Sequence, residues 1–93
     1  MAAKIEVNKV GDEEFQVRIR EAMSETSHRV TLKKEDYERI TDGKVEPAEL
    51  VKRSLEFLLE NEPKESILTR FDLMVIGGYF LDFEREIKRR LSR

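Results

Sequence analysis

Apolar and polar residues alternate through the first third of the chain. Residues 15–20 carry an apolar side chain at every second position, and residues 29–33 repeat this alternation. A period of two is typical of a strand with one buried and one solvated face. Ile5 and Val7 alternate in the same way. We therefore predict three antiparallel strands joined as a meander.

Two polar stretches separate these predicted strands. Gly11 and Asp12 indicate a turn between the first and the second, and the polar residues 24–27 predict the loop between the second and the third. Ile19 and Leu32 can face the same core only if that loop has an even number of residues. A shift by one residue would turn the buried side chains of a strand outward.

The rest of the chain follows helical spacing. A short helix around Tyr37 and Ile40 is expected to end at Gly43, and Pro47 suits the first turn of the helix that follows. Within residues 48–61, apolar residues recur along one helical face. They are Leu50, Val51, Leu55, Leu58 and Leu59. This stripe predicts a helix that packs on the sheet.

Further helices are predicted in the C-terminal third. Pro63 should end the long helix or open a short one whose apolar residues face inward, namely Ile67, Leu68 and Phe71. Asp72 is a favourable N-cap for a helix through residues 73–76. Gly77 and Gly78 should break or kink that helix, since a glycine costs about 1 kcal/mol in a helix interior. Helical spacing then resumes at Tyr79.

Together these elements predict an α+β fold. A three-stranded antiparallel meander within residues 1–33 packs against three to four helices within residues 34–93, and the helix centred on Leu55 covers its apolar face. A chain of 93 residues is short enough to form a single domain, which we place at residues 1–93.

Composition narrows the class of protein. Hydrophobic residues reach 39%, which is enough for a core, and the chain has no cysteine, which excludes disulfide scaffolds and zinc–thiolate sites. The longest apolar run, residues 73–81, is much shorter than the roughly 20 residues that span a bilayer. With neither a signal peptide nor cysteines, we expect a cytoplasmic protein that does not enter the membrane. The net charge of −2 argues mildly against nucleic acid as a partner.

Residues able to perform chemistry are few. His28 is the only histidine, and no serine or acidic pattern marks a partner for it, so we expect it to be a partly covered side chain at a strand end. Glu56 and Glu60 share a helix face but should be solvated, and Gly77–Gly78 lacks the spacing of a phosphate-binding loop. We expect no catalytic residue, no cofactor and no metal site.

One cluster is more apolar than a thin surface layer requires. Its members, which we take as the candidate interface, are Leu73, Met74, Val75, Ile76, Tyr79 and Phe80. A helix that is apolar on several sides lies in the centre of a fold or is covered by another chain. Both alternatives stay open from the sequence. The leading hypothesis is a non-enzymatic protein-interaction module that binds a protein partner or a second copy of itself.

Residues 29–59 resemble a ribbon-helix-helix DNA-binding domain. The resemblance is carried by the strand at 29–33, the short helix around Tyr37, the turn at Gly43 and the helix that begins at Pro47. It implies that the strand pairs with its twin in a dimer and enters the major groove. The residues that would then read bases are Arg29, Thr31 and Lys33. This DNA-binding regulator is the alternative hypothesis.

A longer stretch, residues 15–87, resembles a group of small bacterial proteins to which no function is assigned. The shared features are an Arg-Val-Thr-Leu strand at 29–32, a Glu-Leu-Val-Lys-Arg-Ser helix at 49–54 and a C-terminal series of short motifs. That series comprises Glu-Ser-Ile-Leu at 65–68, Phe-Asp-Leu at 71–73, Val-Ile at 75–76, Tyr-Phe at 79–80 and Phe-Glu at 83–84. The resemblance implies shape and lineage, and it implies no activity.

Overall fold

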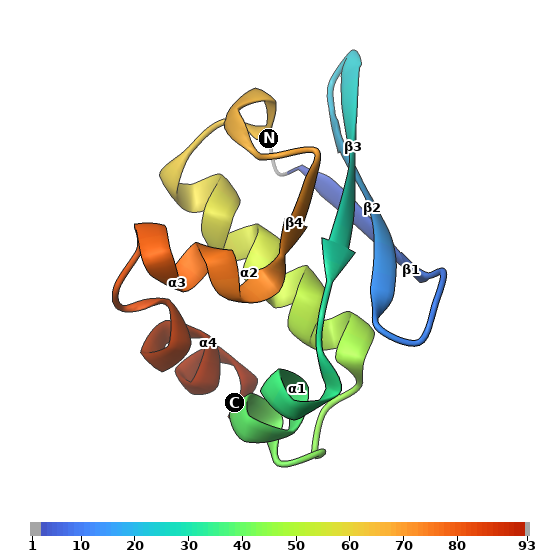
Figure 1. Cartoon of the computed structure of the whole chain (residues 1–93). Coiled ribbons are helices and arrows are strands. Elements are labelled where there is room, and N and C mark those ends of the chain that lie inside the picture. The colour runs from blue at the N-terminus through green and yellow to red at the C-terminus, as the bar shows by residue number, and fades with distance from the viewer. Residues whose placement is uncertain (1–2, 93) are drawn as a thin grey trace.

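A four-stranded sheet lies against a layer of helices in the computed structural model, which describes residues 3–92 (Figure 1). Met1, Ala2 and Arg93 of the predicted domain lie outside the described residues. The strands stand side by side in chain order: β1 (Lys4–Lys9), β2 (Glu14–Glu21), β3 (Ser24–Thr31) and β4 (Arg70–Asp72). The first three are antiparallel, and β4 runs parallel to β3. The predicted α+β fold is confirmed.

The helices gather on one face of this sheet (Figure 1). They are α1 (Lys34–Thr41), α2 (Pro47–Asn61), the 3-10 turns η1 (Lys64–Ser66) and η2 (Leu73–Val75), α3 (Ile76–Tyr79) and α4 (Phe83–Leu91). The long helix α2 packs against β1 and α4. As its sequence predicts, α1 ends before a left-handed Gly43 (φ 73°), and Pro47 opens α2.

The strand register aligns the apolar positions of the meander. Ile5 lies opposite Ile19, Val7 opposite Val17, and Phe15 opposite Val30. These side chains therefore share one face of the sheet, and the apolar stripe of α2 covers that face: Leu50, Val51, Leu55 and Leu58 are buried. Full burial of a side chain of this kind stabilises the fold by about 1.5–3 kcal/mol. Sheet and helices therefore share one core.

The loop predicted at residues 24–27 is wrong. Those residues belong to β3, and the hairpin turns at Ala22 and Met23, with Ala22 in the left-handed region (φ 46°). The loop has an even number of residues, as the common core face of β2 and β3 requires. This end of the hairpin projects past the helices (Figure 1), so most of its side chains meet water and carry no apolar alternation. The sequence of a strand end with polar residues on both faces therefore looks like the sequence of a loop.

The fourth strand corrects the prediction of an all-helical second part. Pro63 opens a short helix as predicted, but this helix is limited to η1, and residues 70–72 form β4, whose Phe71 lies opposite Val30. Ile67 and Phe71 are buried as predicted, whereas Leu68 is exposed. A strand of three residues is too short to show a period of two. Its existence depends on the free edge of β3, which only the folded chain presents.

The two glycines do not break the last helical region. Asp72 caps it as predicted, since its Oδ1 atom accepts a hydrogen bond from the N–H group of Met74 at 2.9 Å. However, α3 contains both Gly77 and Gly78, and the chain leaves the helix at Phe80 (φ −128°, ψ 100°). Burial of Leu73 and Ile76 anchors this segment in the core. That burial outweighs the cost of about 1 kcal/mol for each glycine.

Candidate functional site: an apolar groove near the C-terminus

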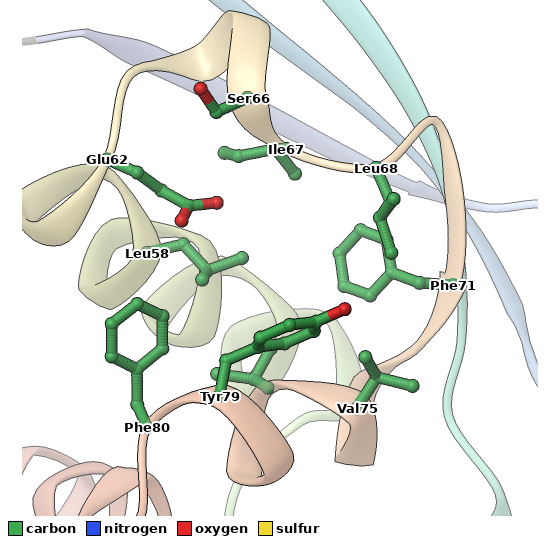
Figure 2. A pocket seen from close by; sticks show the side chains of 10 residues that line it. Leu58, Glu62, Ser66, Ile67, Leu68, Phe71, Val75, Tyr79 and Phe80 are labelled. Carbon is green, nitrogen blue, oxygen red and sulfur yellow. The ribbon is translucent and has the colours of Figure 1, made fainter.

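A groove of about 180 Å³ opens between the end of α2, the segment from η1 to β4, and α3 (Figure 2). Its apolar lining comprises Leu58, Ile67, Leu68, Phe71, Val75, Ile76 and Phe80. The polar side chains that line it are Glu62, Ser66 and Tyr79. We call it the C-terminal groove. It draws its walls from consecutive segments of the chain, all within residues 58–80.

Ring packing fixes the α3 side of the groove. Phe80 meets the ring of Phe57 on α2 edge to face, with ring centres 5.6 Å apart and planes at 88°. Phe57 also lies against Phe83 at the start of α4. Contacts of this kind contribute about 0.5–1.5 kcal/mol beyond the burial of area. They hold the position at which the chain leaves α3, and therefore the width of the groove.

His28 fixes the opposite wall. Its Nδ1 atom lies 2.8 Å from the carbonyl oxygen of Leu68, and its Nε2 atom lies 2.8 Å from Oγ1 of Thr26. The Leu68 carbonyl only accepts hydrogen bonds, so Nδ1 carries a proton and donates it to this bond. The side chain is 2% exposed, more deeply buried than expected at a strand end. His28 is therefore a positioning residue for the groove wall.

The structure divides the candidate interface of the sequence into two groups. Leu73 and Ile76 are buried in the core, and Met74 is half-buried beside Arg39 on α1. The others line the C-terminal groove: Val75, Tyr79 and Phe80, with Ile76 at its floor. The sequence did not indicate the residues that complete it, notably Leu58, Glu62 and Leu68. Their proximity arises from the path of β4, for which the sequence shows no signal.

Among the described residues 3–92, Glu62 is the only charged side chain that lines the groove. Its backbone N–H group donates to the carbonyl of Leu58 and closes the last turn of α2. Figure 2 shows its carboxylate pointing into the groove. Within residues 3–92, no side chain forms a hydrogen bond or an ion pair with it. An acidic group at a helix C-terminus also faces the negative end of the helix dipole.

Of the residues proposed to contact DNA, Arg29 and Thr31 lie on the outer side of the sheet, and Lys33 lies between β3 and α1. Arg29 donates to Oε1 of Glu14 at 3.2 Å, and Lys33 lies 3.8 Å from a carboxylate oxygen of Asp72. Thr31 lies opposite Asp72 across the β3–β4 pair. Because β3 pairs with β2 along one edge and with β4 along the other, it does not form the intersubunit ribbon that the ribbon-helix-helix resemblance implies. That part of the resemblance is wrong.

No family model, no curated protein and no solved structure matches this chain. The likeness to the small bacterial proteins therefore stays a prediction. No helix in residues 3–92 is both long and apolar enough to cross a membrane. The same residues contain no group of three or more acidic or histidine side chains placed to hold a metal ion.

Proposed function

We propose that this protein is a binding module that takes an apolar side chain of another polypeptide into the C-terminal groove. The observation that carries the proposal is a gathering of exposed apolar side chains. In residues 3–92, six large ones are exposed, and four of them lie in or beside the groove: Leu68 (51%), Val75 (38%), Tyr79 (72%) and Leu81 (94%). Single exposed apolar residues are ordinary, whereas a concave group of them is typical of an interaction site.

The volume of the groove supports a side chain as its ligand. Small-molecule sites measure roughly 300–1,000 Å³, and the C-terminal groove measures about 180 Å³. It is closer to an engineered apolar cavity of about 150 Å³ that holds one benzene molecule. A Leu, Met or Phe side chain is a ligand of this size. We therefore infer a protein partner or a second copy of the chain.

The chemistry of the lining supports binding without catalysis. A serine such as Ser66 acts as a nucleophile only beside a base that accepts its proton. The single histidine, His28, already uses both ring nitrogens in hydrogen bonds to Leu68 and Thr26. We therefore propose a non-enzymatic role.

DNA binding through β3 has less support, since Arg29 and Lys33 are paired with acidic side chains. The absence of cysteine supports a cytoplasmic setting.

Selection of short random peptides on the immobilised protein tests this proposal. We expect the retained peptides to share a large apolar residue and to shift the NMR signals of residues lining the groove. Val75→Asp should weaken their binding at least about tenfold, since it places a charge in an apolar site. Val10→Asp is the matched control, because Val10 is 51% exposed in the turn between β1 and β2, away from the groove.

Two outcomes would contradict the proposal. One is that no peptide is retained, and the other is that Val75→Asp and Val10→Asp bind the retained peptides equally well. Tyr79→Ser provides a second variant at an exposed position, so the test does not depend on one substitution. Far-UV circular dichroism verifies that each variant is folded.

A further inference from the structure

The unpaired carboxylate of Glu62 indicates which charged group the ligand carries beside its apolar side chain. It points into a groove that is otherwise almost entirely apolar (Figure 2), where no side chain of residues 3–92 pairs with it. An acidic group beside apolar surface is stabilised by a cation brought by the ligand. The groove therefore fits a ligand that carries one apolar side chain with a basic side chain close to it.

The chain itself carries such a pair. Leu81 is 94% exposed in the turn between α3 and α4, at the left of Figure 1. Arg85 follows four residues later, on the first turn of α4, where it is exposed and no acidic side chain of residues 3–92 forms an ion pair with it. Further along α4, Arg89 binds Glu86 and Arg90 binds Glu60, whereas Lys88 is exposed but lies one turn farther from Leu81 than Arg85 does. Leu81 and Arg85 are therefore free to contact another molecule.

We propose that the occupant of the C-terminal groove is a second copy of this chain, whose Leu81 enters the groove and whose Arg85 pairs with Glu62. This inference rests on the proposed function. Tyr79 and Phe80 line the groove and Leu81 follows them directly, so the projecting side chain and the receiving surface are neighbours. A two-fold axis beside the turn between α3 and α4 places each Leu81 in the groove of the other copy. Such self-complementarity defines a two-fold dimer.

The dimer should be weak and reversible. Four exposed apolar side chains and one small groove form a modest contact, and interfaces at the small end of the range belong to transient complexes. Partial exposure of the Glu62–Arg85 pair should make association sensitive to salt, because dissolved ions screen such charges. We therefore expect dimerisation that rises with protein concentration and falls with ionic strength.

Charge reversal tests this pairing by analytical ultracentrifugation from low micromolar to millimolar concentration. A two-fold dimer contains two Glu62–Arg85 pairs, so Glu62→Arg or Arg85→Glu alone should raise the dissociation constant by about tenfold or more. The double variant with both substitutions should restore it to about the wild-type value, since the charges are exchanged. Glu38→Arg and Lys44→Glu are matched controls at exposed positions of α1 and of the loop after it, and should leave it unchanged.

A separate variant tests the apolar part of the proposed contact. Leu81→Ser removes the side chain that enters the groove, at a position that is almost fully exposed, so the fold should be retained while dimerisation is lost. A wild-type protein that is monomeric at millimolar concentration would overturn the inference. So would a dimer that tolerates both single reversals, or a double variant that stays monomeric.

The peptide selection separates this inference from the proposed function. If peptides bind the groove in a manner that depends on Val75 while the protein stays monomeric, the binding module stands and the occupant is a different polypeptide. If Leu81 and the charge pair control dimerisation, the second copy is established as the occupant. If neither peptides nor a second copy depend on the groove, both proposals fail.

Discussion

His28 and Leu68 join two segments that are 40 residues apart, through a bond of 2.8 Å between the ring Nδ1 atom and the carbonyl oxygen. The bond fixes the backbone just before β4, at the point where Leu68 turns its side chain out of the core and into the wall of the C-terminal groove. The only histidine of the chain therefore supports the candidate site without lining it.

Replacement of His28 should destabilise the fold. His28→Leu replaces the imidazole with an apolar side chain of similar length and leaves the Leu68 carbonyl without its partner, and the loss of a partly buried hydrogen bond costs about 1–3 kcal/mol. Urea unfolding measures this loss. Ser27→Ala, at the adjacent solvent-facing position of β3, is the control and should change the free energy of unfolding by less than about 0.5 kcal/mol. Equal stability of both variants would show that the bond contributes little.

A second contact between distant segments, that of Lys64 with Glu21, belongs to an ion-pair cluster that makes the stability of the fold depend on pH. The side chain of Lys64 is 3% exposed, and its ammonium nitrogen lies 2.6 Å from a carboxylate oxygen of Glu65 and 3.1 Å from one of Glu21 at the end of β2. The hydrogen bond from Lys64 lowers the pKa of Glu65, and the same bond raises the pKa of Lys64. Each group is therefore held more firmly in its charged form in the folded chain than in the unfolded chain.

The two shifts define a pH window of stabilisation. The contribution of Glu65 is complete above its unfolded pKa of about 4.3 and is lost as the pH falls through its lower folded value. The contribution of Lys64 is complete below its unfolded pKa of about 10.4 and is lost as the pH rises through its higher folded value. NMR titration of the Glu65 carboxyl should show a pKa below the ordinary value. Lys64→Met should raise the pKa of Glu65 toward the ordinary value, whereas Lys34→Met, at an exposed lysine, should leave it unchanged.

Substitution by alanine should change the stability of the fold in opposite directions at Gly78 and at Gly43. Gly78 lies in α3 with ordinary helical backbone, and a methyl group added there meets no atom within 4 Å. Gly78→Ala should stabilise the fold by about 0.4–1 kcal/mol, since it reduces the freedom of the unfolded chain. Gly43 has a φ of 73°, so Gly43→Ala should destabilise the fold by about 1–2 kcal/mol. Thermal unfolding compares the two variants with the wild-type protein. A loss of stability in Gly78→Ala would contradict the helical backbone of Gly78 in α3.

Glu62, which we propose binds a basic side chain of the partner, should also reduce the stability of the fold. It is acidic at the C-terminal end of α2, so Glu62→Gln should raise the free energy of unfolding by about 0.3–1 kcal/mol. Glu46 precedes the first turn of the same helix, where a negative charge is favourable, so Glu46→Gln should lower it by a similar amount. Urea unfolding at low salt measures both. The same Glu62→Gln variant should dimerise less well, and a variant both more stable and equally dimeric would argue against a role of this carboxylate in binding.

The sequence determined the elements whose pattern is repeated along the chain. Alternation in residues 15–20 gave β2, and the apolar stripe from Leu50 to Leu58 gave α2, because burial of one face imposes its period on every residue of a strand or helix. The N-cap at Asp72 and the end of α1 before Gly43 were also readable, since each satisfies a local requirement of the backbone, although the C-cap of α1 is Asp42. The requirement that β2 and β3 bury the same face of the sheet also correctly predicted an even number of residues in the turn between them.

Only the tertiary structure decided β4, the helical state of Gly77 and Gly78, and the C-terminal groove. Each depends on packing that the local sequence pattern does not show: β4 needs the free edge of β3, and α3 needs the burial of Leu73 and Ile76 in the core. The groove exists because α2, β4 and α3 meet around a space that their side chains leave open. A local pattern fixes which face of an element is buried. The neighbours that cover this face, and the places that they leave uncovered, are set by the packing of the whole chain.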